Sequence, residues 1–123
     1  MPLLLIGDQP SEELLLAQSK SSFKSDIHFI SGVEDEYVRL AYAAASVFLF
    51  PSFAEGFGWP IAEAMASGCP VITTNEAPMT EVAGNAGFQI NRCPQNANAA
   101  LDWAVESAMV VDHVLTLSPG ERR

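Results

Sequence analysis

Short, uniformly apolar runs alternate along the chain with longer stretches in which apolar residues recur at helical spacing. The apolar runs predict β-strands at residues 3–6, 27–30, 47–50, 71–74 and 87–90. The stretches between and after them predict helices from about residue 10 or 11 to 20, behind residues 31–34, at 60–67 and from 96 to about 115, with one helical turn at 78–83.

Strands that are apolar throughout and separated by helices are typical of a parallel sheet covered on both faces. We therefore expect an α/β fold, a doubly wound, Rossmann-like parallel sheet formed by a single domain over residues 1–123. Two of the helix limits have local signals. Ser31-Gly-Val-Glu34 matches a capping box, and Pro60 and Gly68 stand at the start and just past the end of the helix at 60–67.

Composition and charge exclude some classes of protein. No apolar run approaches the roughly 20 residues that cross a bilayer, and the N-terminal residues lack the basic leader of a signal peptide. We therefore expect a cytoplasmic protein with no transmembrane segment, with peripheral membrane contact only in a longer chain. The net charge of −9 repels phosphate backbones, so we expect no nucleic-acid partner. The same charge is unfavourable for a phosphate ligand.

In parallel sheets of this kind, ligands bind in the loops that follow the carboxyl ends of the strands. Of these loops, the one after residue 50 has the most distinctive chemistry. It carries Glu55, followed by Gly56 and Gly58, which allow close approach of a ligand to the backbone. A helix whose free N–H groups suit an anionic or hydroxyl-rich ligand follows, with Glu63 expected in its first turn. Paired carboxylates beside exposed amides suit sugar hydroxyls.

Each carboxylate also has a simpler interpretation. Acidic residues are common in first turns because they complement the helix dipole, which would account for Glu63. Glu55 alone is compatible with a solvated loop residue. The combination is more specific, because the sequence from Pro51 to Ile72, PSFAEGFGWPIAEAMASGCPVI, resembles the signature of the retaining glycosyltransferases of family 4, which have the GT-B fold. That signature is Glu, seven residues, Glu, within Pro-Ser-x-x-Glu-Gly-Phe-Gly and before Glu-Ala-Met-Ala-x-Gly-x-Pro-Val.

The resemblance extends along the chain and implies roles for individual residues. The segment at 80–87 is similar to the family's Pro-Glu-Val-x-Gly-x-Ala, with Thr80 in place of Pro. By this resemblance Glu55 is the catalytic residue that contacts the hydroxyls of the transferred sugar, and Glu63 binds the ribose. The remaining donor-binding residues it implies are Gly56, Phe57 and Gly58 at the sugar, Ser31 and Val33 beside the base, and Gly7 after the strand that opens the nucleotide half of the site.

Some of these assignments have structural alternatives of similar weight. Ser31 and Glu34 are equally well explained as a helix cap, and Phe57 and Trp59 as packing residues. The resemblance implies a nucleotide-diphosphate sugar as donor, an unknown acceptor, no metal and no cofactor.

The resemblance implies the C-terminal, donor-binding domain of such an enzyme. We expect a chain cut at both ends, without the N-terminal acceptor domain and the basic segment that faces the donor diphosphate, and therefore inactive alone. In this fold the upstream strand occupies the centre of the sheet, between 3–6 and 47–50. Without it those strands pair directly or leave open edges, which favour self-association.

The function implied is transfer of a sugar from a nucleotide sugar to an acceptor hydroxyl. Alternatives are a non-catalytic nucleotide-sugar-binding protein and a GT-B-fold phosphorylase or epimerase. A receiver-like domain is disfavoured, since the acidic pair after its first strand and its late lysine are not found.

Overall fold

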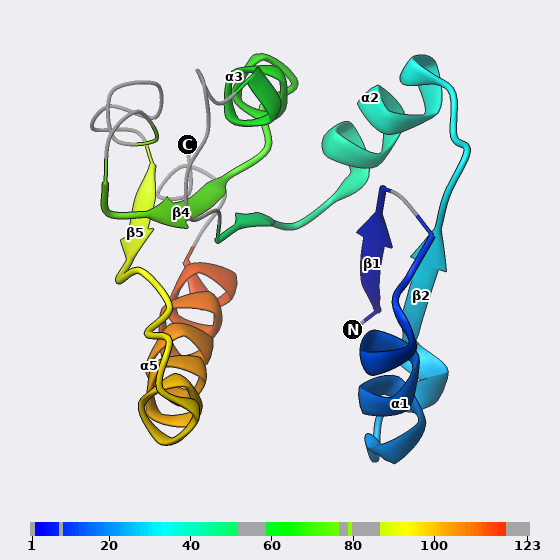
Figure 1. The fold of residues 1–123 in the computed structure, drawn as a ribbon. Helices are drawn as coiled ribbons and strands as arrows, with labels where there is room; N and C mark the ends of the chain where they lie inside the picture. Colours follow the sequence, from blue (N-terminus) through cyan, green and yellow to red (C-terminus); the bar gives the residue numbers. More distant parts are fainter. Residues whose placement is uncertain (1, 8, 52–58, 77–78, 80–86, 118–123) are drawn as a thin grey trace. The chain divides into compact units, whose positions relative to one another are not determined.

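The chain divides into two compact units, Met1–Val38 and Arg39–Arg123. A computed structural model describes residues 2–7, 9–51, 59–76, 79 and 87–117, and the predicted helical turn at 78–83 falls mostly outside this part (Figure 1). Within the described residues the elements alternate between strands and helices, and all paired strands are parallel. The predicted α/β class is confirmed.

The first unit contains two parallel strands, β1 (Leu3–Ile6) and β2 (Ile27–Ile30), in the register Leu3 to Ile27 through Ile6 to Ile30. They are connected by helix α1 (Glu12–Lys20) and the short 3-10 helix η1 (Lys24–Asp26). The hydroxyl of Ser11 accepts a hydrogen bond from the Leu14 N–H at 3.2 Å and so begins α1.

The prediction that 3–6 is buried on both faces is wrong. All four side chains of β1 are exposed, with exposed fractions between 39% and 47%. The apolar pattern is the same as in β4 (Val71–Thr74), whose four residues are all buried. The difference lies in the neighbours, because β4 has a strand on each side whereas β1 pairs only with β2 among the described strands. A two-stranded sheet provides too few contacts to bury a strand.

Helix α2 (Asp35–Ala44) begins later than the capping pattern predicts. The carbonyl of Glu34 accepts hydrogen bonds from the Tyr37 and Val38 N–H groups at 3.0 and 3.3 Å, so Glu34 stands at the helix start instead of inside its first turn. The Ser31 hydroxyl accepts from the side-chain amide of Gln9 instead. The capping box at 31–34 is therefore not formed, and Gly32, at φ +68°, turns the chain before the helix.

The second unit contains a three-stranded sheet in the order β3 (Phe48–Phe50), β4, β5 (Phe88–Ile90). Helices α3 (Trp59–Ala66) and α5 (Ala97–Thr116) cover its opposite faces (Figure 1). Adjacent β4 residues point to opposite faces: Val71 packs with Ile61 and Ala64 of α3, whereas Ile72 packs with Ile90 and Val114 of α5. The core of this unit therefore consists of two apolar layers.

The ends of these helices agree with the sequence signals. Gly68 has a φ of +79°, the left-handed conformation that ends many helices, just past α3. The side chain of Asn96 accepts hydrogen bonds from the N–H groups of Asn98 and Ala99 at 2.9 and 3.1 Å, which begins α5.

The described strands form two parallel sheets, β1 with β2 in the first unit and β3 with β4 and β5 in the second. Each of β1 and β3 pairs on one side only among the described residues, and β1 also exposes apolar side chains.

We expect the 123-residue chain to self-associate through the open edge of β1. Sedimentation velocity should show a mass that rises with concentration, and Leu5→Lys should lower it because charges on an edge strand oppose edge-to-edge pairing. The matched control is Leu101→Lys, on an equally apolar but helical surface position of α5. A monomer whose unfolding is independent of concentration would contradict this expectation.

Candidate functional site

In the first unit, two of the predicted donor-binding residues lie at the same edge of the sheet. The Gly7 N–H, directly after β1, donates to the carbonyl of Ile30 at 3.0 Å, and Ser31 is the next residue. The side-chain amide of Gln9 donates to the Ser31 hydroxyl at 2.8 Å, which joins the two loops. Val33 follows in the same loop and is half-buried. The structure thus brings Gly7 and Ser31 together at the carboxyl ends of β1 and β2.

Gly7 has a further property that bears on its role. Its φ is not positive, and a Cβ atom added there would meet no other atom within 4 Å. Neither backbone conformation nor local packing therefore requires glycine at this position. Gly32 and Gly68, in contrast, both have positive φ values that favour glycine.

The residues at the centre of the prediction fall in the connection between β3 and α3. Glu55, Gly56, Phe57 and Gly58 lie outside the described residues, and their predicted roles stay predictions. The two elements on either side are described: β3 ends at Phe50 and α3 begins at Trp59. The carboxylate of Glu55 thus belongs to a connection that leaves the carboxyl end of a strand and enters a helix.

The sequence did not single out the threonines that support the start of this connection. Thr73 and Thr74, at the end of β4, are buried. The Thr73 hydroxyl donates to the carbonyl of Phe50 at 3.0 Å, which fixes the last residue of β3 to the neighbouring strand. The signal was a pair of hydroxyl residues closing an otherwise apolar strand, because a buried hydroxyl needs a hydrogen-bond partner.

Glu63 lies on α3 but not in its first turn. The helix begins at Trp59, so Glu63 is its fifth residue and no acidic residue occupies the first turn. The prediction took Pro60 as the helix start, which made Glu63 the fourth residue, one position earlier than in the structure. Compensation of the helix dipole, which is confined to the first turn, therefore explains Glu63 less well. Its side chain is exposed.

The charge of Glu63 acts on a tyrosine of the preceding helix. Tyr42, on α2, packs edge-on against Phe48 with 5.1 Å between ring centroids, and Phe48 stacks on Phe50 at 5.6 Å. Burial raises the pKa of the Tyr42 hydroxyl above its ordinary value of 10.0, and the negative charges of Glu63 and then Cys69 raise it further. The charge of Glu63 therefore affects the aromatic cluster formed by Tyr42 of α2 with Phe48 and Phe50 of β3.

We expect Glu63→Gln to lower the pKa of Tyr42 in part, because burial remains the largest cause. A Tyr37→Phe background leaves Tyr42 as the titrating tyrosine, and tyrosinate absorbance gives the pKa. Since the pKa is higher in the folded state, Tyr42 favours folding fully below pH 10.0, and this contribution is lost as the pH rises through the raised pKa. Tyr42→Phe should remove that loss. An unchanged Tyr42 pKa in Glu63→Gln would show that the carboxylate lies elsewhere.

One pair of opposite charges lies beyond the ends of β4 and β5. Arg92 and Glu76 approach to 3.7 Å, and both side chains are about half exposed. An exposed pair contributes little to stability. Neither residue belongs to a motif in the sequence, although Arg92 provides a cation beyond the carboxyl end of β5.

Two further features concern the described residues only. Within 2–7, 9–51, 59–76, 79 and 87–117, no three His, Cys, Asp or Glu side chains gather as metal ligands would. No helix in this part of the chain has the length and apolar character to cross a membrane.

The known proteins to which this chain is similar are glycosyltransferases. The sequence profile of the family described as glycosyl transferases group 1 matches residues 1–107. The chain is 42% identical over 89 residues to the O-antigen chain mannosyltransferase B of Escherichia coli, across 71% of this chain and 23% of that protein. It is 37% identical over 78 residues to the MMP alpha-(1->4)-mannosyltransferase of Mycolicibacterium hassiacum, across 63% of this chain and 18% of that protein.

A third relative transfers a different sugar. The lipopolysaccharide glucosyltransferase WaaG of Escherichia coli K12 is 38% identical over 73 residues, which cover 58% of this chain and 19% of that protein. The chain thus spans less than a quarter of the length of these three relatives. Because the family profile matches most of its residues, the chain belongs to the glycosyl transferases group 1.

Proposed function

We propose that the chain is the donor-binding part of a retaining glycosyltransferase that moves a sugar from a nucleotide-diphosphate sugar to an acceptor hydroxyl. Membership of the group 1 family supports sugar transfer as the general activity. The observation that carries the finer proposal is the order β3, connection, α3, with Glu55 in the connection and Glu63 on the helix. In parallel α/β sheets this is the edge at which ligands bind.

In the proposed complex, Glu55 contacts the hydroxyls of the transferred sugar, and the amides of Gly56 to Gly58 face the same sugar. Glu63 holds the ribose hydroxyls. Its exposed side chain and its place beyond the first turn of α3 leave the carboxylate available for a ligand. Carboxylates accept hydrogen bonds from hydroxyl groups, which both the transferred sugar and the ribose carry.

The first unit would hold the nucleotide half of the donor. Ser31 and Val33 border the base, and Gly7 leaves room beside it. Support comes from the hydrogen bonds that bring the two loops to one sheet edge, and from the absence of any local requirement for glycine at position 7.

Most of the rate acceleration would come from electrostatic stabilisation. As the bond to the nucleotide breaks, negative charge develops on the leaving diphosphate and positive charge on the sugar ring. A fixed carboxylate and oriented backbone amides stabilise such charges in a site that excludes water. The proposed enzyme uses no metal and no organic cofactor, so chelation of divalent cations by EDTA should leave turnover unchanged.

The relatives suggest which donor to test first. Two of those above are named as mannosyltransferases and one as a glucosyltransferase. Mannosyl and glucosyl donors on UDP, GDP and ADP therefore form the first panel.

The test is product analysis with the polypeptide expressed at the full length of its gene. We expect one donor to yield a new glycoside whose anomeric configuration, read from its NMR coupling constants, equals that of the donor. Inversion would refute the retaining mechanism. A free sugar 1-phosphate would identify a phosphorylase, and an isomerised nucleotide sugar an epimerase. Donor binding without any product would identify a non-catalytic binding protein.

A further inference from the structure

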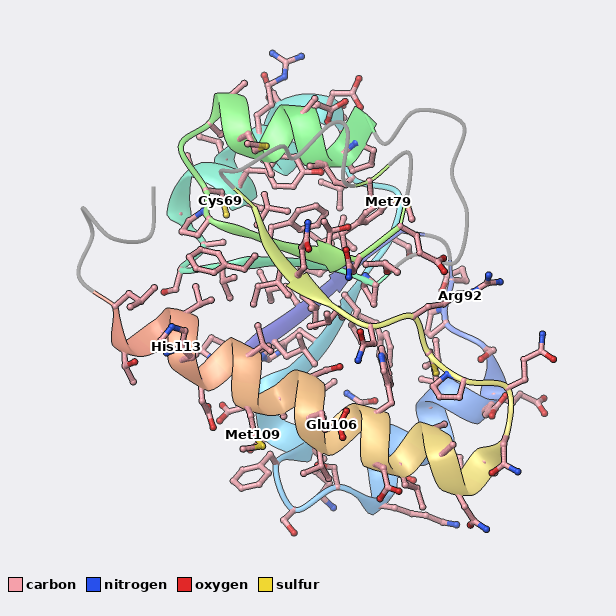
Figure 2. All side chains as sticks on the ribbon, turned by 90° about the vertical axis from the view of Figure 1, so that its left-hand side faces the viewer. Cys69, Met79, Arg92, Glu106, Met109 and His113 are labelled. Carbon is pink, nitrogen blue, oxygen red and sulfur yellow. The ribbon has the colours of Figure 1, made fainter. Side chains whose placement is uncertain are left out.

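A shallow cavity of about 110 Å³ lies between the edge strand β5 and helix α5. Its polar and aromatic lining comes from both elements: Gln89 and Asn91 on and after β5, and Trp103, Glu106 and Ser107 on α5. Figure 2 shows Glu106 in the middle of α5, on the side of the molecule that faces the viewer. None of these residues belongs to the proposed donor site.

The indole ring of Trp103 is held in place. Its Nε1–H donates to the carbonyl of Asn91 at 2.5 Å, and the ring packs against the buried cluster of Ile72, Ile90 and Val114. The ring is half-buried and also lines the cavity. An aromatic surface in a fixed position next to an open cavity is ready to receive a flat apolar face without first being ordered.

The face of α5 that lines the cavity carries polar groups among apolar ones. Trp103, Glu106 and Ser107, together with Val110, follow the i, i+3, i+4, i+7 spacing of one helix face. A face that served only for packing on β5 would be apolar throughout. Instead, Glu106 offers a carboxylate and Ser107 a hydroxyl, whereas the side chain of Gln89 points to the other face of the sheet, since Phe88 and Ile90 on either side of it pack toward α5. Glu106 and Ser107 together present both donors and acceptors.

We propose that this cavity binds one uncharged sugar ring of a glycan, with the apolar face of the ring on Trp103 and its hydroxyls on Glu106 and Ser107. Glu106 and the net charge of −9 disfavour phosphorylated ligands. The site lies under α5, on the face of the sheet opposite α3.

This glycan site does not depend on the proposed transfer reaction, and its test involves neither donor nor turnover. The full-length polypeptide, labelled with ¹⁵N, is titrated with methyl α-mannoside, and the indole N–H signal of Trp103 is followed by NMR. Comparison with a Trp103→Phe spectrum assigns the signal. We expect a saturable shift with a dissociation constant in the millimolar range, on the order of 1 mM or weaker.

Two positions on the lining face of α5 test the contacts. Glu106→Gln and Ser107→Ala should each weaken binding about three- to tenfold, as expected for loss of a hydrogen bond to a ligand. Leu101→Ser, on the outer face of the same helix and 68% exposed, is the matched control and should bind as the wild type does. Mannose 6-phosphate should bind at least about tenfold more weakly than the methyl mannoside, because Glu106 repels the phosphate.

Three results would overturn the proposal. These are a Trp103 signal that does not saturate, binding that is unchanged in both Glu106→Gln and Ser107→Ala, and mannose 6-phosphate binding as tightly as the neutral sugar. Each leaves the donor site untouched, so a failure here is distinct from a failure of the proposed transferase.

Discussion

Glu55→Gln is expected to reduce sugar transfer by the full-length polypeptide by about two to three orders of magnitude, the loss typical when one group that stabilises transition-state charge is removed. The substitution keeps the size of the side chain and removes its charge. Because glutamine and glutamate have the same shape, the fold should remain intact. Initial rates with the best donor of the panel give the effect, and circular dichroism verifies the fold.

A charge-matched control separates the role of Glu55 from a general loss of negative charge. Glu76→Gln, after β4 and in an exposed pair with Arg92, also removes one carboxylate and should leave the rate within about a factor of two, because exposed ion pairs contribute little. Near-normal turnover in Glu55→Gln would refute the catalytic role. A rate that falls equally in both variants would point to long-range electrostatics instead.

Ile72→Ala is expected to lower the free energy of unfolding of the second unit by about 2–5 kcal/mol. Ile72 is fully buried in β4, the central strand of its sheet, where it packs with Ile90 and Val114. Truncation removes apolar contacts and leaves a cavity between the sheet and α5. Since small domains are stable by only about 5–15 kcal/mol, the loss should be plain in the urea midpoint.

The control for Ile72→Ala is Leu49→Ala on β3, at a side chain that is 40% exposed. It removes the same number of carbon atoms from a neighbouring strand. We expect a clearly smaller loss, because part of that side chain is in water already. Equal losses at the two positions would contradict the assignment of the core to the two layers around β4.

Much of the second unit could be predicted from the sequence. The strands at 71–74 and 87–90 and the helix ends at Gly68 and Asn96 follow local rules of apolar runs and end signals, and the structure confirms them. These features depend on residues close together in the chain. Local patterns are therefore sufficient for them.

The burial of β1 could not be predicted in the same way. Its sequence, LLLI, is as apolar as that of β4, yet its side chains are exposed. The burial of a strand depends on the strands and helices that lie next to it. An apolar sequence shows only that the strand is suited to burial. The exposed β1 is suited to an interior position that the described part of the chain does not provide.

Part of the local geometry around the candidate site was predicted, although the roles of its residues stay predictions. The meeting of Gly7 with Ser31 follows from parallel strands ending at one edge, and the structure confirms it. The cap at Ser31 was wrong, because the hydroxyl found a partner in Gln9 from another loop, which a local pattern does not contain. Glu63 was placed in the first turn, one residue too early, because α3 begins at Trp59 ahead of Pro60.

Supporting residues were harder to predict than candidate ligands. Thr73 acts through a hydrogen bond to Phe50, 23 positions earlier in the sequence. The pKa of Tyr42, on α2, is raised in part by the charge of Glu63, on α3. The spacing of these residues in the sequence predicts neither interaction. The side chains of Thr73 and Tyr42 nevertheless lie around β3, the strand from which the connection carrying Glu55 departs.

Titration of the full-length polypeptide with nucleotide sugars tests the central claim most directly. Isothermal calorimetry with UDP-, GDP- and ADP-linked mannose and glucose should give saturable one-to-one binding for one nucleotide. Glu63→Gln should weaken that binding about tenfold, because a charged hydrogen-bond partner of the ribose is lost. Glu76→Gln should leave it unchanged. Saturation by no member of the panel, or binding equally tight in Glu63→Gln, would contradict a nucleotide-sugar site at the connection between β3 and α3.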